Sequence, residues 1–109
     1  MKYDEDLAQR MRAEMERIPG FAEKKMFGGI GFLINGNMAC GLNGSNLIVR
    51  VGPEDYEQAL GKPFARVFDM TGRPMKGWIT VAPEGYAAEK DLKSWIRQGV
   101  AFAQSLPAK

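Results

Sequence analysis

The sequence contains two asparagine-glycine pairs, Asn35-Gly36 and Asn43-Gly44, and each lies between short runs of apolar residues. A two-residue hairpin turn of type I′ needs positive φ angles at both central residues, which Asn and Gly tolerate. The two pairs therefore predict two tight hairpins and a three-stranded antiparallel meander, with strands around 29–34, 38–42 and 46–51.

Alternate residues of a strand point to opposite faces of its sheet, so the apolar pattern also predicts which side chains are buried. The first strand carries Ile30, Phe32 and Ile34 on one face, the second carries Met38, Cys40 and Leu42 on one face, and the third carries Leu47, Val49 and Val51 on one face. Leu33, Ile48 and Arg50 are expected on the other side of their strands. A second face with apolar residues needs a cover of its own.

Three helices are predicted around this meander. Leu7, Met11, Met15 and Ile18 recur at helical spacing over residues 4–18, and Pro19-Gly20 ends that helix. Residues 53–60 form a short helix, because proline suits the first helical position and Gly61 suits a helix end.

The last helix is predicted over residues 88–105. Its apolar stripe consists of Leu92, Trp95, Ile96, Gly99, Phe102, Ala103 and Leu106. Two further strands are expected at 66–70 and 76–81, with a turn at 71–74 between them. The element order is α-β-β-β-α-β-β-α, and the fold class is α+β: two layers, with an antiparallel five-stranded sheet and helices on one face.

Length and composition limit the classes of function. The 109 residues are expected to form a single domain, 1–109, because no linker or repeat divides them. One cysteine and no histidine exclude an intramolecular disulfide, a cysteine-rich zinc site and the histidine-dependent hydrolase triads. We therefore expect no catalytic residue, no cofactor and no metal, and the chain is predicted not to be an enzyme. The acidic N-terminus and the absence of a long apolar run predict a cytoplasmic protein.

Two motifs are interpreted as structural. Cys40 is predicted to be a small buried core residue, because it lies inside a strand between apolar neighbours. Gly28-Gly29-Ile30-Gly31 is followed by a strand, whereas a dinucleotide loop joins a strand to a helix, so close backbone approach is the preferred explanation. A small-ligand site or an enzyme using this segment with Arg73 is the third hypothesis.

A basic set of residues lies in or beside the strands: Lys24, Lys25, Arg50, Arg66, Arg73 and Lys76. Aromatic residues Phe27, Phe32, Phe68 and Trp78 are interleaved with it. Sheets that bind single-stranded nucleic acid combine stacking rings with cations in this way. The net charge is only +2, so direct contact of the sheet with nucleic acid is the alternative to a protein partner.

The segment Lys25-Met26-Phe27-Gly28-Gly29 and the segment from Phe68 to Met75, Phe-Asp-Met-Thr-Gly-Arg-Pro-Met, resemble the TfoX/Sxy N-terminal domain family. Gly77-Trp78 and the C-terminal run from Phe102 to Pro107 are also similar to its short, single-domain branch. The resemblance implies a two-layer fold of the secretion-chaperone type and suggests homodimers. Longer members regulate natural competence with a cyclic-AMP receptor protein and carry a second, C-terminal domain, and no catalytic role of the motif residues carries over.

The leading hypothesis is a non-enzymatic protein-interaction module with a transcription-regulatory role that acts as a homodimer. The sheet face away from the helices would be covered by a second copy, with Leu33 and Ile48 at or near the interface. The six cations would be the contact residues of the nucleic-acid alternative.

Overall fold

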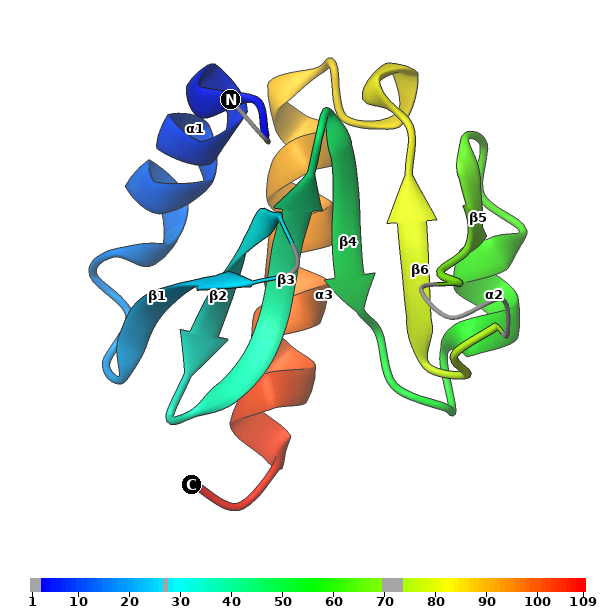
Figure 1. The fold of residues 1–109 in the computed structure, drawn as a ribbon. Coiled ribbons are helices and arrows are strands. Elements are labelled where there is room, and N and C mark those ends of the chain that lie inside the picture. The colour runs from blue at the N-terminus through cyan, green and yellow to red at the C-terminus, as the bar shows by residue number, and fades with distance from the viewer. Residues whose placement is uncertain (1–2, 27, 70–73) are drawn as a thin grey trace.

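The computed structural model describes residues 3–26, 28–69 and 74–109 (Figure 1). Along the chain the elements are α1 (Glu5–Met15), β1 (Phe21–Met26), β2 (Gly29–Ile34), β3 (Asn37–Asn43), β4 (Asn46–Arg50), α2 (Tyr56–Leu60), β5 (Ala65–Val67), β6 (Trp78–Val81), the 3₁₀ turn η1 (Pro83–Gly85) and α3 (Glu89–Ser105).

The strands form one antiparallel sheet in the order β1-β2-β3-β4-β6-β5. Figure 1 shows α3 crossing behind the middle of the sheet, with α1 and α2 toward its two ends. We call the face packed against the helices the inner face and the opposite one the outer face. The predicted α+β class with helices on one face is confirmed.

The predicted number of five strands was wrong, because the sheet has a sixth strand, β1. Its residues Glu23, Lys24 and Lys25 are consecutive charges and show no apolar alternation. Such a segment becomes a strand only because the apolar strand β2 offers it a complete ladder, from Phe21 opposite Ile34 to Met26 opposite Gly29. Charged residues on an edge strand also discourage pairing with another chain.

The first hairpin turn is confirmed as type I′, because Asn35 and Gly36 have φ angles of 54° and 82°. The second turn differs from the prediction. Asn43 pairs with Asn46, so the two connecting residues are Gly44 and Ser45. Positive φ at the first of them only, 62° at Gly44, is the pattern of a type II′ turn.

A β-bulge changes the faces of β3. Phe32 pairs with Cys40 and Leu33 pairs with Met38, so Ala39 has no partner on β2. Met38 therefore lies on the outer face beside Gly41, whereas Cys40 faces the core, and the prediction of one shared face was wrong for Met38. A side-chain carbon at Gly99 of α3 would lie 2.4 Å from the carbonyl oxygen of Ala39, so only glycine lets the helix approach the bulge.

The helices lie where their apolar spacing predicts, with different ends. In α1 the Asp4 carboxylate accepts the backbone N–H of Leu7 at 3.2 Å and caps the helix, which ends at Met15, three residues earlier than expected. The second helix begins at Tyr56, because residues 53–55 form a turn first. The strands expected at 66–70 and 76–81 are shorter, Ala65–Val67 and Trp78–Val81. Of the predicted turn at 71–74, residues 71–73 lie outside the described residues.

One hydrophobic core fills the space between the inner face and the helices. Phe32, Leu47 and Val49 are fully buried there, and Trp95 of α3 is only 5% exposed. The Trp95 indole Nε1 donates a hydrogen bond to the Gly85 carbonyl at 3.2 Å. Cys40 is fully buried, and its Sγ lies 3.6 Å from Met15 Sδ, which confirms its predicted place in the core.

Candidate functional site

The outer face of the sheet combines apolar side chains with cations. Strand alternation and the bulge place apolar residues beside cations there. The outward-facing residues of β2 to β6 include Leu33, Met38, Ile48, Arg50, Arg66, Trp78 and Thr80. Gly31 and Gly41 pair with each other on β2 and β3 and leave no side chain at that point of the outer face. No helix covers it in Figure 1.

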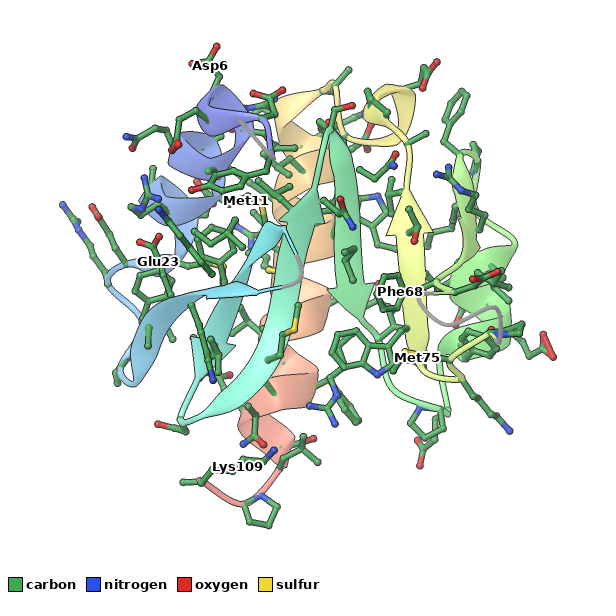
Figure 2. The ribbon with its side chains drawn as sticks, viewed as in Figure 1. Asp6, Met11, Glu23, Phe68, Met75 and Lys109 are labelled. Atoms are coloured by element: carbon green, nitrogen blue, oxygen red, sulfur yellow. The ribbon has the colours of Figure 1, made fainter. Side chains whose placement is uncertain are left out.

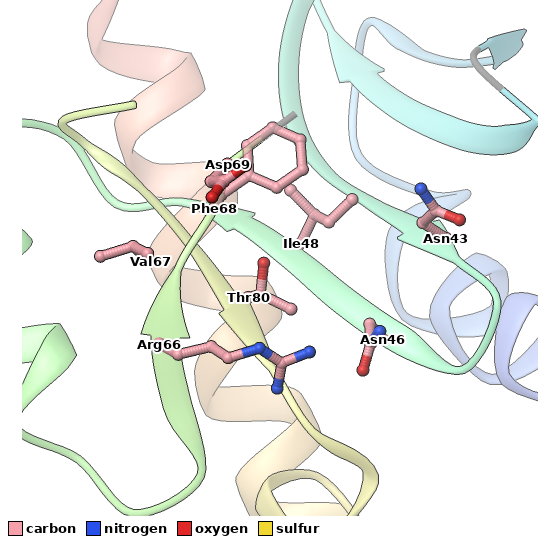
Figure 3. A pocket seen from close by; sticks show the side chains of 8 residues that line it. All are labelled: Asn43, Asn46, Ile48, Arg66, Val67, Phe68, Asp69 and Thr80. Atoms are coloured by element: carbon pink, nitrogen blue, oxygen red, sulfur yellow. The ribbon is translucent and has the colours of Figure 1, made fainter. Parts of the chain in front are cut away.

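Part of this face is hollowed. We call this concavity the Arg66 hollow; its volume is about 360 Å³, and it is lined by Asn43, Asn46, Ile48, Arg66, Val67, Phe68, Asp69 and Thr80. Figure 3 shows the Arg66 side chain reaching across it toward Asn46 and Thr80, while the Val67 side chain points away from it. The floor is formed where Ile48 of β4 is opposite Thr80 of β6.

The lining residues are able to bind an acidic group beside an apolar one. The guanidinium of Arg66 has five N–H donors, and Asn46 and Thr80 add an amide and a hydroxyl. Within residues 3–26, 28–69 and 74–109, Arg66 belongs to none of the ion pairs. Ile48 and Phe68 supply the apolar wall. A guanidinium without a carboxylate partner is the group that planar anions bind best.

Arg50, unlike Arg66, packs against aromatic rings. Its guanidinium carbon lies 5.1 Å from the ring centroid of Trp78 and 5.3 Å from that of Phe102 on α3. Trp78 also packs at 6.1 Å against Phe68. These cation–π contacts connect the end of β4 with the end of α3, so Arg50 stabilises the edge of the core.

The structure does not gather the predicted basic set into one patch. Lys24 is on the outer face of β1, and Lys25 is on the opposite side of the same strand. Arg66 lies on β5 at the other edge, about 24 Å from β1 along the sheet at the usual strand spacing. In Figure 2 the labelled Glu23 marks β1 at one end of the sheet, and β5 lies at the other end. Lys76 is exposed ahead of β6, and Arg73 lies outside the described residues.

The aromatic residues of the predicted nucleic-acid site are also divided. Phe32 is fully buried on the inner face, whereas Phe68 and Trp78 are half-buried on the outer face. Phe27 lies outside the described residues.

The glycine segment has a structural role at Gly29. A side-chain carbon at this position would lie 2.0 Å from the Leu42 carbonyl oxygen, so the neighbouring strand requires glycine there. The Arg66 hollow is not lined by residues 28–31, which were expected in a ligand site, and Arg73, which was expected beside them, lies outside the described residues.

Burial raises the pKa of the Cys40 thiol to about 12, so almost no thiolate forms near neutral pH. No group of three or more Cys, Asp or Glu residues that could hold a metal ion occurs among the residues whose placement is described. In the same part of the chain, no helix has both the length and the apolar character needed to cross a membrane.

Sequence reasoning identified Arg66 but missed its surroundings. Asn43 was interpreted only as a turn residue and Asn46 only as the start of a strand, and Thr80 was not singled out. The available signal was alternation, because Thr80 interrupts the apolar run Ile79–Val81 at the position that faces outward. The pairing of β4 with β6, which places Ile48 beside Thr80, has no local signal in the sequence.

Comparison with known proteins agrees with the observed fold. The model of the family described as the TfoX N-terminal domain matches residues 13–103, from within α1 to near the end of α3. A search among curated proteins found no match.

Proposed function

This chain belongs to the TfoX N-terminal domain family, and we propose that it is a non-enzymatic protein-interaction module with a transcription-regulatory role, working in the cytoplasm as a homodimer. The family suggests a regulatory or interaction module. The observation that carries the proposal is the outer face, an apolar strip bordered by charges and left open by the helices.

The chemistry of the outer face favours a protein partner over nucleic acid. Its centre contains Leu33, Met38 and Ile48 around two glycines, and its cations Lys24 and Arg66 lie at opposite edges of the sheet. Protein interfaces have this arrangement of an apolar core within a polar rim. A groove for single-stranded nucleic acid needs cations along one continuous path.

A second copy is the proposed cover of the outer face. A twofold axis places the same patch on both subunits, and an apolar strip is complementary to itself. Leu33 and Met38 are half-buried in the single chain and would become buried in the dimer. Ile48 is only 6% exposed, so it would lie beneath the interface and contribute little new contact area.

Sedimentation equilibrium at micromolar concentrations tests the homodimer. We expect a mass of twice 12.1 kDa for the unmodified chain. Leu33→Glu should give the monomer mass, because it places a charge in the apolar strip. Ala101→Glu adds the same charge on the exposed side of α3 and should leave the dimer intact. A mass of 12.1 kDa at every concentration of the unmodified chain would refute the homodimer.

A further inference from the structure

The exposed large apolar side chains gather at one edge of the sheet. Among the described residues, Phe64 is 53% exposed, Val67 39% and Met75 37%. Val67 ends β5, Phe64 directly precedes it, and the Met75 N–H donates to the carbonyl of Phe68, the first residue after β5. The other edge strand, β1, carries three consecutive exposed charges, Glu23, Lys24 and Lys25, whereas β5 carries one, Arg66. Proteins protect an edge strand with charges, whereas an exposed apolar edge marks a site where another strand binds.

The backbone of β5 also has unpaired groups on its free side. The Phe64 carbonyl accepts the N–H of Ala82 at 3.0 Å, which places Phe64 in a hydrogen-bonded pair. Such pairs alternate in an antiparallel ladder, so Arg66 directs its backbone groups to β6, and Ala65 and Val67 direct theirs outward. The Ala65 N–H donates to the Lys62 carbonyl at 3.2 Å. Among the residues that the structure describes, the Ala65 carbonyl and both backbone groups of Val67 have no backbone partner, so an added strand could bind them.

Phe64, directly before β5, has an unusual backbone conformation. Its φ angle of 66° is in the left-handed region, which large side chains rarely adopt. Strain of this kind at an exposed residue is typical of binding sites. Phe64 also lines, with Lys62 and Trp95, a second hollow of about 300 Å³.

We propose that the free edge of β5 binds an extended segment of another protein as an additional strand, and that this segment alternates apolar and acidic residues. The inference deepens the proposed interaction function by naming the partner's chemistry. A residue opposite Arg66 would point to the outer face, the same face as the exposed Arg66 side chain, so a carboxylate there can pair with this cation across the ladder. The residues on either side of it would lie opposite Ala65 and Val67 and point to the other face of the sheet.

Charge distinguishes this partner from a second copy of the chain. Arg66 is the central residue of a three-residue strand. Antiparallel pairing of two such strands about a twofold axis brings Arg66 opposite or next to its copy, and like charges across a ladder are destabilising. Lys62, just ahead of the strand, adds to the repulsion. An acidic strand replaces this repulsion with attraction.

Fluorescence anisotropy with short labelled peptides tests the proposal. The probe alternates valine and glutamate, and the matched control alternates valine and lysine. We expect the glutamate peptide to bind the full chain about tenfold more tightly than the lysine peptide or better, because only a carboxylate pairs with Arg66. N-methylation of the probe backbone should abolish binding, since it removes the strand donors.

Two variants locate the site. Val67→Pro removes the outward N–H without removing a bond to β6, and proline is accepted at such edge positions. Arg66→Glu reverses the charge. Each should weaken binding of the glutamate peptide by about tenfold or more. Lys24→Glu makes the same charge change on the outer face at the opposite edge, and should leave the affinity unchanged.

Several results would overturn the proposal. These are no binding of the glutamate peptide, equal binding of the lysine peptide, or undiminished binding by folded Val67→Pro and Arg66→Glu proteins. Self-association that Val67→Pro abolishes would assign the edge to a second copy instead. Failure of the outer-face homodimer is a separate outcome, because it is measured by sedimentation of the unmodified chain.

Discussion

Replacement of Trp95 by alanine should lower the free energy of unfolding by about 4 kcal/mol. The indole is only 5% exposed within the core beneath the sheet, and truncation of a buried Trp typically costs about 3 to 5 kcal/mol through lost transfer energy and the cavity left behind. Two polar contacts are lost with it. Nε1 donates to the Gly85 carbonyl at 3.2 Å, and Lys62 Nζ lies 4.7 Å from the ring centroid.

Urea unfolding followed by far-UV circular dichroism measures this loss. With an m-value of about 1.3 kcal/mol/M for a chain of this size, the midpoint should fall by about 3 M. Trp95→Phe is the matched control, because it keeps an aromatic ring and removes the indole N–H. Its expected cost is about 1.5 kcal/mol, the range of one hydrogen bond with a small cavity. A loss below about 1 kcal/mol for Trp95→Ala would show that this stripe of α3 is not part of the core.

Two further predictions concern Cys40 and the ion pair between α1 and β1. Cys40→Ala should leave partner binding intact. In the unmodified chain the Cys40 thiol should react with Ellman's reagent only in denaturant, because it is fully buried and its pKa is raised to about 12. Rapid labelling of the native chain would contradict this. The Arg12 guanidinium donates two hydrogen bonds to the Glu23 carboxylate, at 2.5 and 2.8 Å, and lowers the pKa of that carboxyl below its usual value near 4.5. The ion pair therefore stabilises the fold fully above pH 4.5, and this contribution disappears as the pH falls through the lower pKa of the folded state. Glu23→Gln should therefore cost about 0.5 to 1 kcal/mol in urea unfolding near neutral pH and progressively less as the solution is acidified below that value, whereas a constant difference would remove the ion pair as the cause.

Local sequence accounts well for the elements and for the core. Residues Leu7, Met11 and Met15 recur at helical spacing and are buried on α1. Leu47 and Val49 of β4, and Val51 just after it, alternate and are buried. The turn at Asn35-Gly36 follows from the backbone preferences of two adjacent residues. These features depend only on residues close together in the chain, so the sequence is sufficient to predict them.

The candidate site depends on contacts between distant segments. Arg66 could be named from the sequence as a cation beside a strand, but the hollow around it requires β6 to lie between β4 and β5. Met38 reaches the outer face only because the chain bulges at Ala39, where Gly99 of α3 packs against the carbonyl. Neither the strand order nor the bulge leaves a repeating pattern in the surrounding residues.

The amino-acid sequence by itself thus determined the hairpin meander, the three helices, the inner apolar face and the absence of histidine-based chemistry. The tertiary structure decided that β1 joins the sheet, that the predicted cations lie far apart, and that the exposed apolar residues border β5. The physical reason is that backbone preference and periodicity act over a few neighbouring residues. The choice of partner strand is made by packing and hydrogen bonding across the whole fold, because each strand binds whichever edge buries its apolar face and satisfies its backbone.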